Sequence, residues 1–188
     1  FKYCKEMTEK YGENTVIFME VGSFFEIYEI DIKNVKIGNA REIGKTLNFQ
    51  ISRKNKSKEH NEKNPYMVGF PNYAIDKHIS KLMEYNYTVI KVIQYDNENK
   101  SITTKSRKID KIYSPSTYID NITDTSNYLV CVYIDTHNKQ IIGHLSAIDV
   151  STGETKLYTA YDKNNITNKT ENDIFRFIHS LNPKEILF

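Results

Sequence analysis

The sequence predicts an α/β (α+β) protein in which a mixed β-sheet flanked by helices is followed by a second, smaller α/β unit. β-branched apolar runs such as TVIFMEV alternate with segments whose apolar residues recur every three or four positions. These are the patterns of buried strands and amphipathic helices. A polar stretch without periodicity, residues 114–127, has the composition of a linker. These observations favour two domains of modest size.

Apolar periodicity defines the elements expected in the first unit, residues 1–113. Helices are expected over residues 1–11, 25–38 and 73–85, and strands over residues 15–21, 45–52, 65–70, 87–95 and 107–113. The helix over residues 25–38 rests on four apolar residues at spacings of three and four: Phe25, Tyr28, Ile32 and Val35. Ser23 is expected to be its N-cap, and Glu26 stands three residues later, as in a capping box.

The second unit, residues 128–188, is expected to contain three antiparallel strands, then a helix, then a returning strand. The strands are expected over residues 128–135, 140–150 and 154–161, the helix over residues 172–181, and the last strand over residues 185–188. This is the opening order of an RNase H-like fold, and about half of such a fold is present. Both ends of the chain are expected to be cut from a longer protein, because it begins without methionine and stops on an apolar run.

Positive charge is concentrated in two segments, although the net charge of the chain is only +2. Residues 41–63 contain seven Lys and Arg against three Glu, a net charge of +4, and residues 100–111 contain five Lys and Arg against one Asp, also +4. Clustered basic residues are typical of nucleic-acid binding. Two solvated surface loops would give the same pattern.

Several classes of protein are not indicated by the sequence. No apolar run approaches the roughly 20 residues that a transmembrane helix needs, and no secretory signal is recognised at the start. Cys4 and Cys131 are far apart and have no CxxC partner, so a reduced intracellular compartment is expected. The GxxxxGK[ST] phosphate-binding motif is absent from these residues, so no ATP site, metal or other cofactor is expected in them.

The segment VIFMEVGSFFEIYEID resembles the start of the mismatch-recognition domain of MutS proteins, in which an apolar strand is followed by Gly, one residue, Phe, an aromatic residue and Glu. PYMVGFPNYAIDKHISKLMEYNYTVIKV and RKIDKIYSPST are similar to later parts of that domain, and IDVSTGETKLY and LNPKEILF to the start of the MutS connector domain. The resemblance covers essentially the whole chain in order. Residues 1–113 would then be the mismatch-recognition domain, and residues 128–188 the truncated connector.

The resemblance implies a sensor of mismatches or small loops in double-stranded DNA. Phe24 would wedge into the minor groove and stack on a mispaired base, and Glu26 would hydrogen-bond to that base. An apolar wedge unstacks a base step at a cost of a few kcal/mol, which is lower at a mismatch because the duplex deforms more easily there. Glu26 would accept a base N–H or share a proton with a base nitrogen, with helix capping as its rival role. Phe25 is expected to point inward.

Four basic residues are expected to contact DNA phosphates: Arg53, Lys54, Lys77 and Lys111. One departure concerns Asn72-Tyr73, which replaces an aromatic–His pair common in bacterial MutS proteins, so DNA contacts assigned to that pair do not carry over directly. The Lys-, Asn- and Ile-rich composition suggests a divergent giant-virus or organellar branch. The full-length protein is expected to be an intracellular, DNA-associated ATPase that binds ATP and Mg²⁺ and acts as a clamp, either a homodimer or a MutS-like heterodimer.

Two alternative functions remain open from the sequence. An RNase H-like second unit could be a metal-dependent nuclease, and Asp135, Asp149 and Glu154 are the candidate metal ligands. However, such a site needs several converging carboxylates, and Asp135 and Glu154 adjoin predicted turns, where acidic residues are common. The other alternative is a protein-interaction module without DNA binding, which the two basic segments disfavour.

Overall fold

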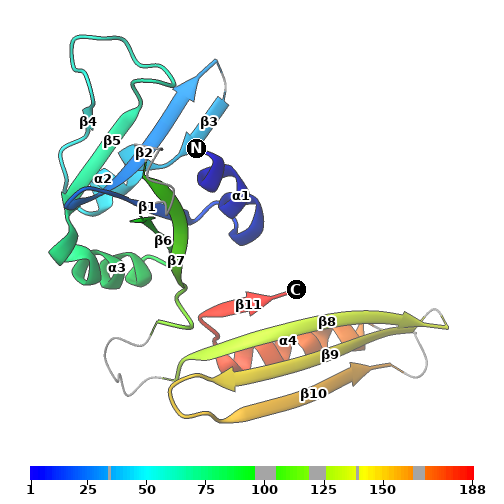
Figure 1. The fold of residues 1–188 in the computed structure, drawn as a ribbon. Helices are drawn as coiled ribbons and strands as arrows, with labels where there is room; N and C mark the ends of the chain where they lie inside the picture. The colour runs from blue at the N-terminus through cyan, green and yellow to red at the C-terminus, as the bar shows by residue number, and fades with distance from the viewer. Residues whose placement is uncertain (34, 96–104, 119–125, 139, 163–167) are drawn as a thin grey trace. The chain divides into compact units, whose positions relative to one another are not determined.

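A computed structural model describes residues 1–33, 35–95, 105–118, 126–138, 140–162 and 168–188, which form two compact units, Phe1–Ser114 and Pro115–Phe188 (Figure 1). Each unit contains a β-sheet with one or more helices packed against it, which confirms the predicted fold class. The turn expected at residues 96–101 and half of the expected linker lie outside the described residues.

The first unit is built on one mixed sheet. Its strands are β1 (Thr15–Val21), β2 (Phe24–Ile32), β3 (Val35–Gly38), β4 (Ser52–Arg53), β5 (Tyr66–Pro71), β6 (Thr88–Tyr95) and β7 (Ser106–Tyr113). Among the described residues they pair in the order β4-β5-β2-β1-β6-β7, and β3 pairs with β2. The β1–β6 pair is parallel and the others are antiparallel. The center of the sheet is therefore β2-β1-β6, which contributes buried residues such as Phe18, Ile27 and Ile90 to the core.

Helices cover both faces of this sheet. They are α1 (Lys2–Tyr11), α2 (Ala40–Thr46) and α3 (Ile75–Glu84), and the short 3₁₀ helix η1 (Asn72–Ala74) leads into α3. On one face, Cys4 of α1 packs in a cluster with Ile17 and Ile90. On the other face, Phe70 contacts Phe18 and the His78 ring of α3. The helices over residues 1–11 and 73–85 are confirmed, as are the strands over residues 15–21, 65–70, 87–95 and 107–113.

The helix expected over residues 25–38 is wrong, because that segment forms β2 and β3. Phe25, Ile27 and Glu29 alternate along β2 as buried residues, which is the two-residue period of a strand. Glu29 hides this period in the sequence, since a carboxylate is rarely fully buried unless it is paired. The expected capping box is wrong for the same reason, since Ser23 lies in the turn between β1 and β2 and no helix begins there.

The strand expected over residues 45–52 is also largely wrong. Residues 45 and 46 belong to α2, and only Ser52 of this segment is in a strand, β4. Gly44 lets α2 approach the sheet closely, because a Cβ at this position would lie 2.9 Å from Cγ1 of Ile51 and 3.0 Å from Cγ2 of Val68. A glycine inside a helix lowers its intrinsic propensity, so packing determines this short helix.

The second unit contains a four-stranded sheet with one helix against it, within the described residues. Its elements are β8 (Tyr128–His137), β9 (Gln140–Asp149), β10 (Thr155–Tyr161), α4 (Lys169–Leu181) and β11 (Glu185–Leu187). The strand order is β10-β9-β8-β11, and β11 runs parallel to β8. The apolar stripe of α4, which includes Ile174 and Phe177, packs on a core formed by the sheet. The expected order of strands and helix in this unit is confirmed.

The packing of His78 predicts a pH dependence of stability in the first unit. Its ring lies 4.8 Å from the Phe49 ring and 4.5 Å from the Phe70 ring, measured between centroids. Burial, with the neighbouring charge of Lys77, lowers the pKa of His78 below the ordinary histidine value of 6.5. The unfolded chain therefore takes up this proton first, so stability falls as pH drops below about 6.5.

Urea denaturation at pH 8 and pH 5.5 tests this effect. We expect the free energy of unfolding to fall by more in the wild type than in His78→Phe, which keeps a ring of similar size without a titratable group. An equal loss in the two proteins would contradict the prediction.

Candidate nucleic-acid interface

A tight hairpin turn joins the end of β1 to the start of β2, and Phe24 is the first residue of β2. Val21 pairs with Phe24, so the loop has only two residues, Gly22 and Ser23. Gly22 has a φ of 61°. A glycine with positive φ at the first of the two positions is the requirement of a type II′ turn, whose twist matches the two strands. Gly22 and Ser23, which the sequence predicts just before a helix, therefore form the loop of a β-hairpin.

Neighbouring elements hold this turn from two sides. The backbone N–H of Gly22 donates to Oε1 of Gln94 in β6 at 3.3 Å. The backbone N–H of Asn72, the first residue of η1, donates to the carbonyl oxygen of Ser23 at 2.9 Å. The position of Gln94 is itself fixed, because its backbone N–H donates to the Glu20 carboxylate at 2.7 Å. The hairpin tip thus has a defined position on the sheet.

The two phenylalanines after the turn point in opposite directions. Phe24 is 46% exposed, whereas Phe25 is 3% exposed and packs near the rings of Phe18 and Phe70. Consecutive residues of a strand face opposite sides of a sheet, so the alternation follows from the strand itself. The inward orientation expected for Phe25 is confirmed. Phe24 presents an apolar ring to solvent beside a fixed turn.

Glu26 lies on the same face of β2 as Phe24. Its carboxylate is half-buried and accepts a hydrogen bond from the Tyr28 hydroxyl, two residues further along the strand. Burial, together with this hydrogen bond to Glu26, raises the pKa of Tyr28, so the hydroxyl remains a donor at neutral pH. Across the strand pair Glu26 faces Gly69, where no side chain competes for the space. An exposed ring and a carboxylate therefore share one face at the hairpin end.

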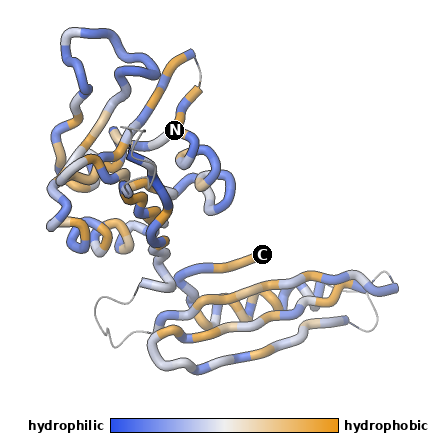
Figure 2. Tube along the Cα trace, in the orientation of Figure 1, coloured by the Kyte–Doolittle hydropathy of each residue, from blue (hydrophilic) through white to orange (hydrophobic). Residues whose placement is uncertain are grey.

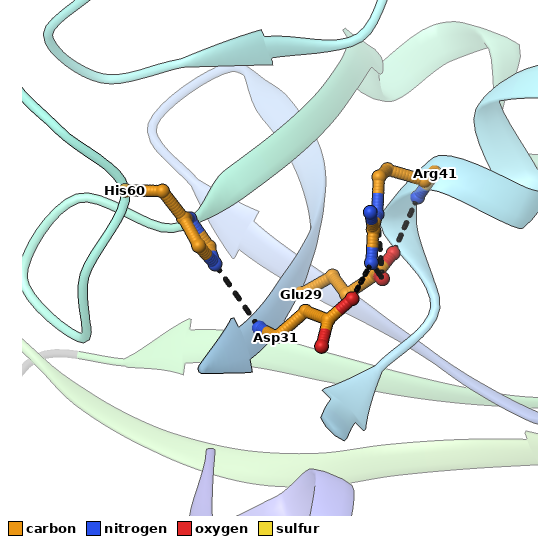
Figure 3. A network of polar contacts seen from close by, with 4 residues as sticks. All are labelled: Glu29, Asp31, Arg41 and His60. Atoms are coloured by element: carbon orange, nitrogen blue, oxygen red, sulfur yellow. Dashed lines mark hydrogen bonds and ion pairs between the residues drawn. The ribbon is translucent and has the colours of Figure 1, made fainter. Parts of the chain in front are cut away.

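A network of ionic contacts occupies the other end of β2 (Figure 3). The Arg41 guanidinium binds the Glu29 carboxylate, with Nη2 to Oε1 at 2.6 Å, and also pairs with Asp31. Nε2 of His60 accepts a hydrogen bond from the Asp31 backbone N–H at 3.0 Å. Glu29 is only 1% exposed, and its charge is compensated by Arg41, whose pKa is raised by the hydrogen bond that it donates to Glu29. This network joins α2 and the loop after β4 to the sheet.

The structure separates the four basic residues predicted from the sequence. Arg53 pairs with Tyr66, which is five residues, or about 17 Å, along β5 from the Pro71 that pairs with Phe24. Its guanidinium donates to the carbonyl oxygens of Lys56 and Lys58, at 3.2 Å and 2.9 Å, inside the hydrophilic loop between β4 and β5 (Figure 2). Arg53 thus orders this loop.

The other three predicted residues are exposed. Lys54 follows Arg53 into the same loop. Lys77 lies in the first turn of α3, which follows the η1 residue bonded to Ser23. Lys111 lies on the edge strand β7, with its ammonium 4.9 Å from the centre of the Tyr113 ring. Lys77 thus lies in the helix that follows the residue bonded to the hairpin, and Lys111 lies on an edge strand of the sheet. Arg53 and Lys54 instead lie at the end of β5 that is far from the hairpin.

Two basic residues near the hairpin were not selected from the sequence. Arg107 pairs across β6–β7 with Gln94, whose side chain holds Gly22, and Lys108 follows it. Both are exposed. The excess of basic residues over residues 100–111 indicates that this segment could bind DNA. Only the register of β7 against β6 shows that Arg107 and Lys108 lie near the hairpin. Tyr73, next to Asn72, is 85% exposed and is a further candidate for contact with a ligand.

A family model for MutS domain I matches residues 1–122. The chain belongs to the MutS family. Curated relatives include the DNA mismatch repair protein MutS of Caldanaerobacter subterraneus, 31% identical over 99% of this chain, and that of Finegoldia magna, 29% identical over all of it. A putative DNA mismatch repair MutS homologue of Acanthamoeba polyphaga mimivirus is 28% identical over 93% of the chain. The chain covers 19%, 20% and 16% of these relatives, respectively.

Asp135 lies far from the other two candidate acidic residues in the second unit of this MutS chain. Asp149 pairs with Tyr128 on β8 and Asp135 lies seven residues further along that strand, about 23 Å away. The Asp149 carboxylate accepts backbone N–H bonds from Asn127 and Ser151, at 3.1 Å and 3.0 Å. Burial opposes ionisation of Asp149, but these bonds outweigh it and lower its pKa. Asp149 therefore stabilises the ends of β8 and β9.

Glu154 accepts a hydrogen bond from the Tyr128 hydroxyl at 2.6 Å. Among the described residues of this MutS chain, no three His, Cys, Asp or Glu side chains are grouped as metal ligands would be. The geometry thus gives the nuclease alternative no metal site in that part of the chain.

No helix in the described ranges has both the length and the apolar character needed to cross a bilayer.

Proposed function

We propose that this chain recognises mispaired bases or small loops in double-stranded DNA, with Phe24 as the wedge and Glu26 as the base-contacting group. The observation that carries the proposal is the 46% exposure of Phe24 at a hairpin tip held by Gln94 and Asn72. Inserting an apolar side chain between base steps costs a few kcal/mol in unstacking. The cost is lower at a mismatch, where stacking and pairing are already weakened.

The carboxylate of Glu26 supplies the polar part of the recognition. Placed two residues after Phe24 on the same face of β2, it can reach a base beside the wedge. A carboxylate near DNA is repelled by phosphates unless it gains a hydrogen bond from a base. Glu26 therefore favours sites where a displaced base offers an N–H, and it disfavours a regular duplex.

Phosphate contacts supply affinity without sequence preference. Arg107, Lys108 and Lys111 on β7, with Lys77 on α3, are the main candidates, and Arg53 and Lys54 would contact a more distant part of the duplex. Residues 1–113 form the recognition domain in this proposal, residues 114–127 a linker, and residues 128–188 the start of the connector. The full-length protein would be an intracellular ATP- and Mg²⁺-dependent clamp, either a homodimer or a MutS-like heterodimer.

Equilibrium titration of labelled duplexes tests the function. One duplex carries a single G·T mismatch and the other is fully paired but otherwise identical. We expect tighter binding to the mismatched duplex at moderate salt. Equal affinity for the two duplexes would contradict the proposal.

Lys111, on the edge strand β7, should affect the affinity for all duplexes, whereas the wedge residue Phe24 should affect the preference for a mismatch. Lys111→Ala should weaken binding to matched and mismatched duplexes by the same factor, and should reduce the slope of log affinity against log salt by about one. Lys81→Ala is the matched control, because Lys81 is already paired with Glu84 at 2.6 Å. A change in mismatch preference in Lys111→Ala would show that Lys111 contacts bases.

A further inference from the structure

We infer that Tyr28 is a positioning residue for Glu26: its hydroxyl holds one carboxylate oxygen so that the other is presented to a mispaired base. This inference rests on the proposed function and adds to it a residue that determines how well a mismatch is distinguished. The motif with Phe24 and Glu26 does not include Tyr28. It is the geometry of β2 that places all three on one face.

Strand geometry makes the contact between Tyr28 and Glu26 direct. Residues two apart on a strand face the same way, so Tyr28 and Glu26 are neighbours along β2. The Tyr28 hydroxyl donates to Oε2 of Glu26. Donation to Oε2 leaves Oε1 available to another donor. Because Gly69 stands opposite Glu26, the space on the β5 side of the carboxylate is not filled by a side chain.

The Tyr28 ring is itself held in place. Its edge meets the Phe1 ring, with a centroid distance of 6.4 Å and an interplanar angle of 69°. Partial burial and the contact with Phe1 restrict the orientation of the ring, so its hydroxyl is a positioned donor for the carboxylate.

A fixed donor matters because the glutamate side chain is flexible. An unrestrained Glu must lose rotamer freedom when it binds a base, which weakens binding. Tyr28 removes part of this freedom before DNA arrives. Hydrogen bonds to a charged group are also stronger than those between neutral groups, so this contact can hold the side chain in one orientation. The benefit is realised only where Glu26 contacts a base, that is, at a mismatch.

The decisive variant is Tyr28→Phe, which removes the hydroxyl oxygen and keeps the ring. In the G·T and matched titrations we expect Tyr28→Phe to lower the preference for the mismatch about tenfold, equivalent to about 1.4 kcal/mol, with unchanged affinity for the matched duplex. In a Glu26→Ala background the same change should have no further effect, since the group that it positions is gone. Tyr85→Phe, at an exposed tyrosine after α3, is the control for loss of a hydroxyl.

The outcomes separate this inference from the function on which it rests. Equal binding of both duplexes by the wild type would overturn the proposed function and the positioning role together. A wild-type preference that survives Tyr28→Phe, or that falls equally with and without Glu26, would overturn the positioning role alone.

A DNA-free measurement tests the contact itself. Phenolate absorbance should show one tyrosine that ionises at lower pH in Glu26→Gln than in the wild type, and this transition should be missing in Tyr28→Phe. An unchanged titration in Glu26→Gln would overturn the hydrogen bond between the two side chains.

Discussion

Phe24→Ala should abolish the preference for a mismatched duplex while leaving the protein folded. Stacking of an aromatic side chain on a base contributes about 1–3 kcal/mol, so affinity for the G·T duplex should fall by roughly 10- to 100-fold. Affinity for the matched duplex should change little, because the wedge is not inserted there. Fluorescence anisotropy with the two duplexes measures both effects.

Thermal or urea unfolding of Phe24→Ala provides the structural check. Phe24 is about half exposed, so we expect the free energy of unfolding to change by less than about 1 kcal/mol. The adjacent Phe25→Ala should lose about 3–5 kcal/mol, as expected for a buried phenylalanine. A loss in Phe24→Ala as large as that in Phe25→Ala would mean that Phe24 belongs to the core and is no wedge.

Arg41→Ala should lower the free energy of unfolding of the first unit by about 3–5 kcal/mol. The side chain of Glu29 is 1% exposed, and Arg41 contacts it with Nε at 2.8 Å and Nη2 at 2.6 Å. Removing the guanidinium leaves a buried carboxylate without a cation, although the Arg41 backbone N–H still donates to Glu29 at 2.7 Å. Urea denaturation at neutral pH measures the loss.

Two further variants assign that loss to the buried charge. Asp31→Asn removes the exposed partner of Arg41, and because its side chain is 44% exposed we expect a loss below about 1 kcal/mol. The double variant Arg41→Ala with Glu29→Gln removes the unpaired charge and should regain part of the stability lost in Arg41→Ala. No recovery in the double variant would mean that packing of the arginine stem, and not the buried charge, accounts for the loss.

The sequence predicts β1 and α3 correctly, because the apolar pattern within each segment is enough to identify it. β1 is a continuous run of apolar residues and α3 has apolar residues at helical spacing, and the structure follows both patterns. β2 could not be predicted in this way, because Glu29 occupies a core position that is tolerated only through Arg41, twelve residues away. The resulting sequence pattern imitates a helix. In the same way, the close packing at Gly44 that defines α2 is visible only in three dimensions.

The candidate site was predictable in part. The motif pointed to Phe24 and Glu26 without any knowledge of the strand on which they lie. The sequence pattern counts Tyr28 among the apolar residues of an expected helix, so the contact of its hydroxyl with Glu26 was hidden. Arg107 and Lys108 required the register of β7 against β6, which depends on long-range pairing and not on local composition.

The ionic network at the far end of β2 has a consequence for the electric field that DNA would meet. β2 carries three carboxylates, those of Glu26, Glu29 and Asp31. An unscreened row of negative charge on this strand would oppose the approach of a polyanion. Arg41 pairs with both carboxylates at the far end and cancels one of their two negative charges. The negative charge at the far end is therefore reduced, and Glu26 is the carboxylate that stands on the same face as Phe24. If Glu26 acts as proposed, its repulsion of phosphate would be offset only where a base donates a hydrogen bond to it.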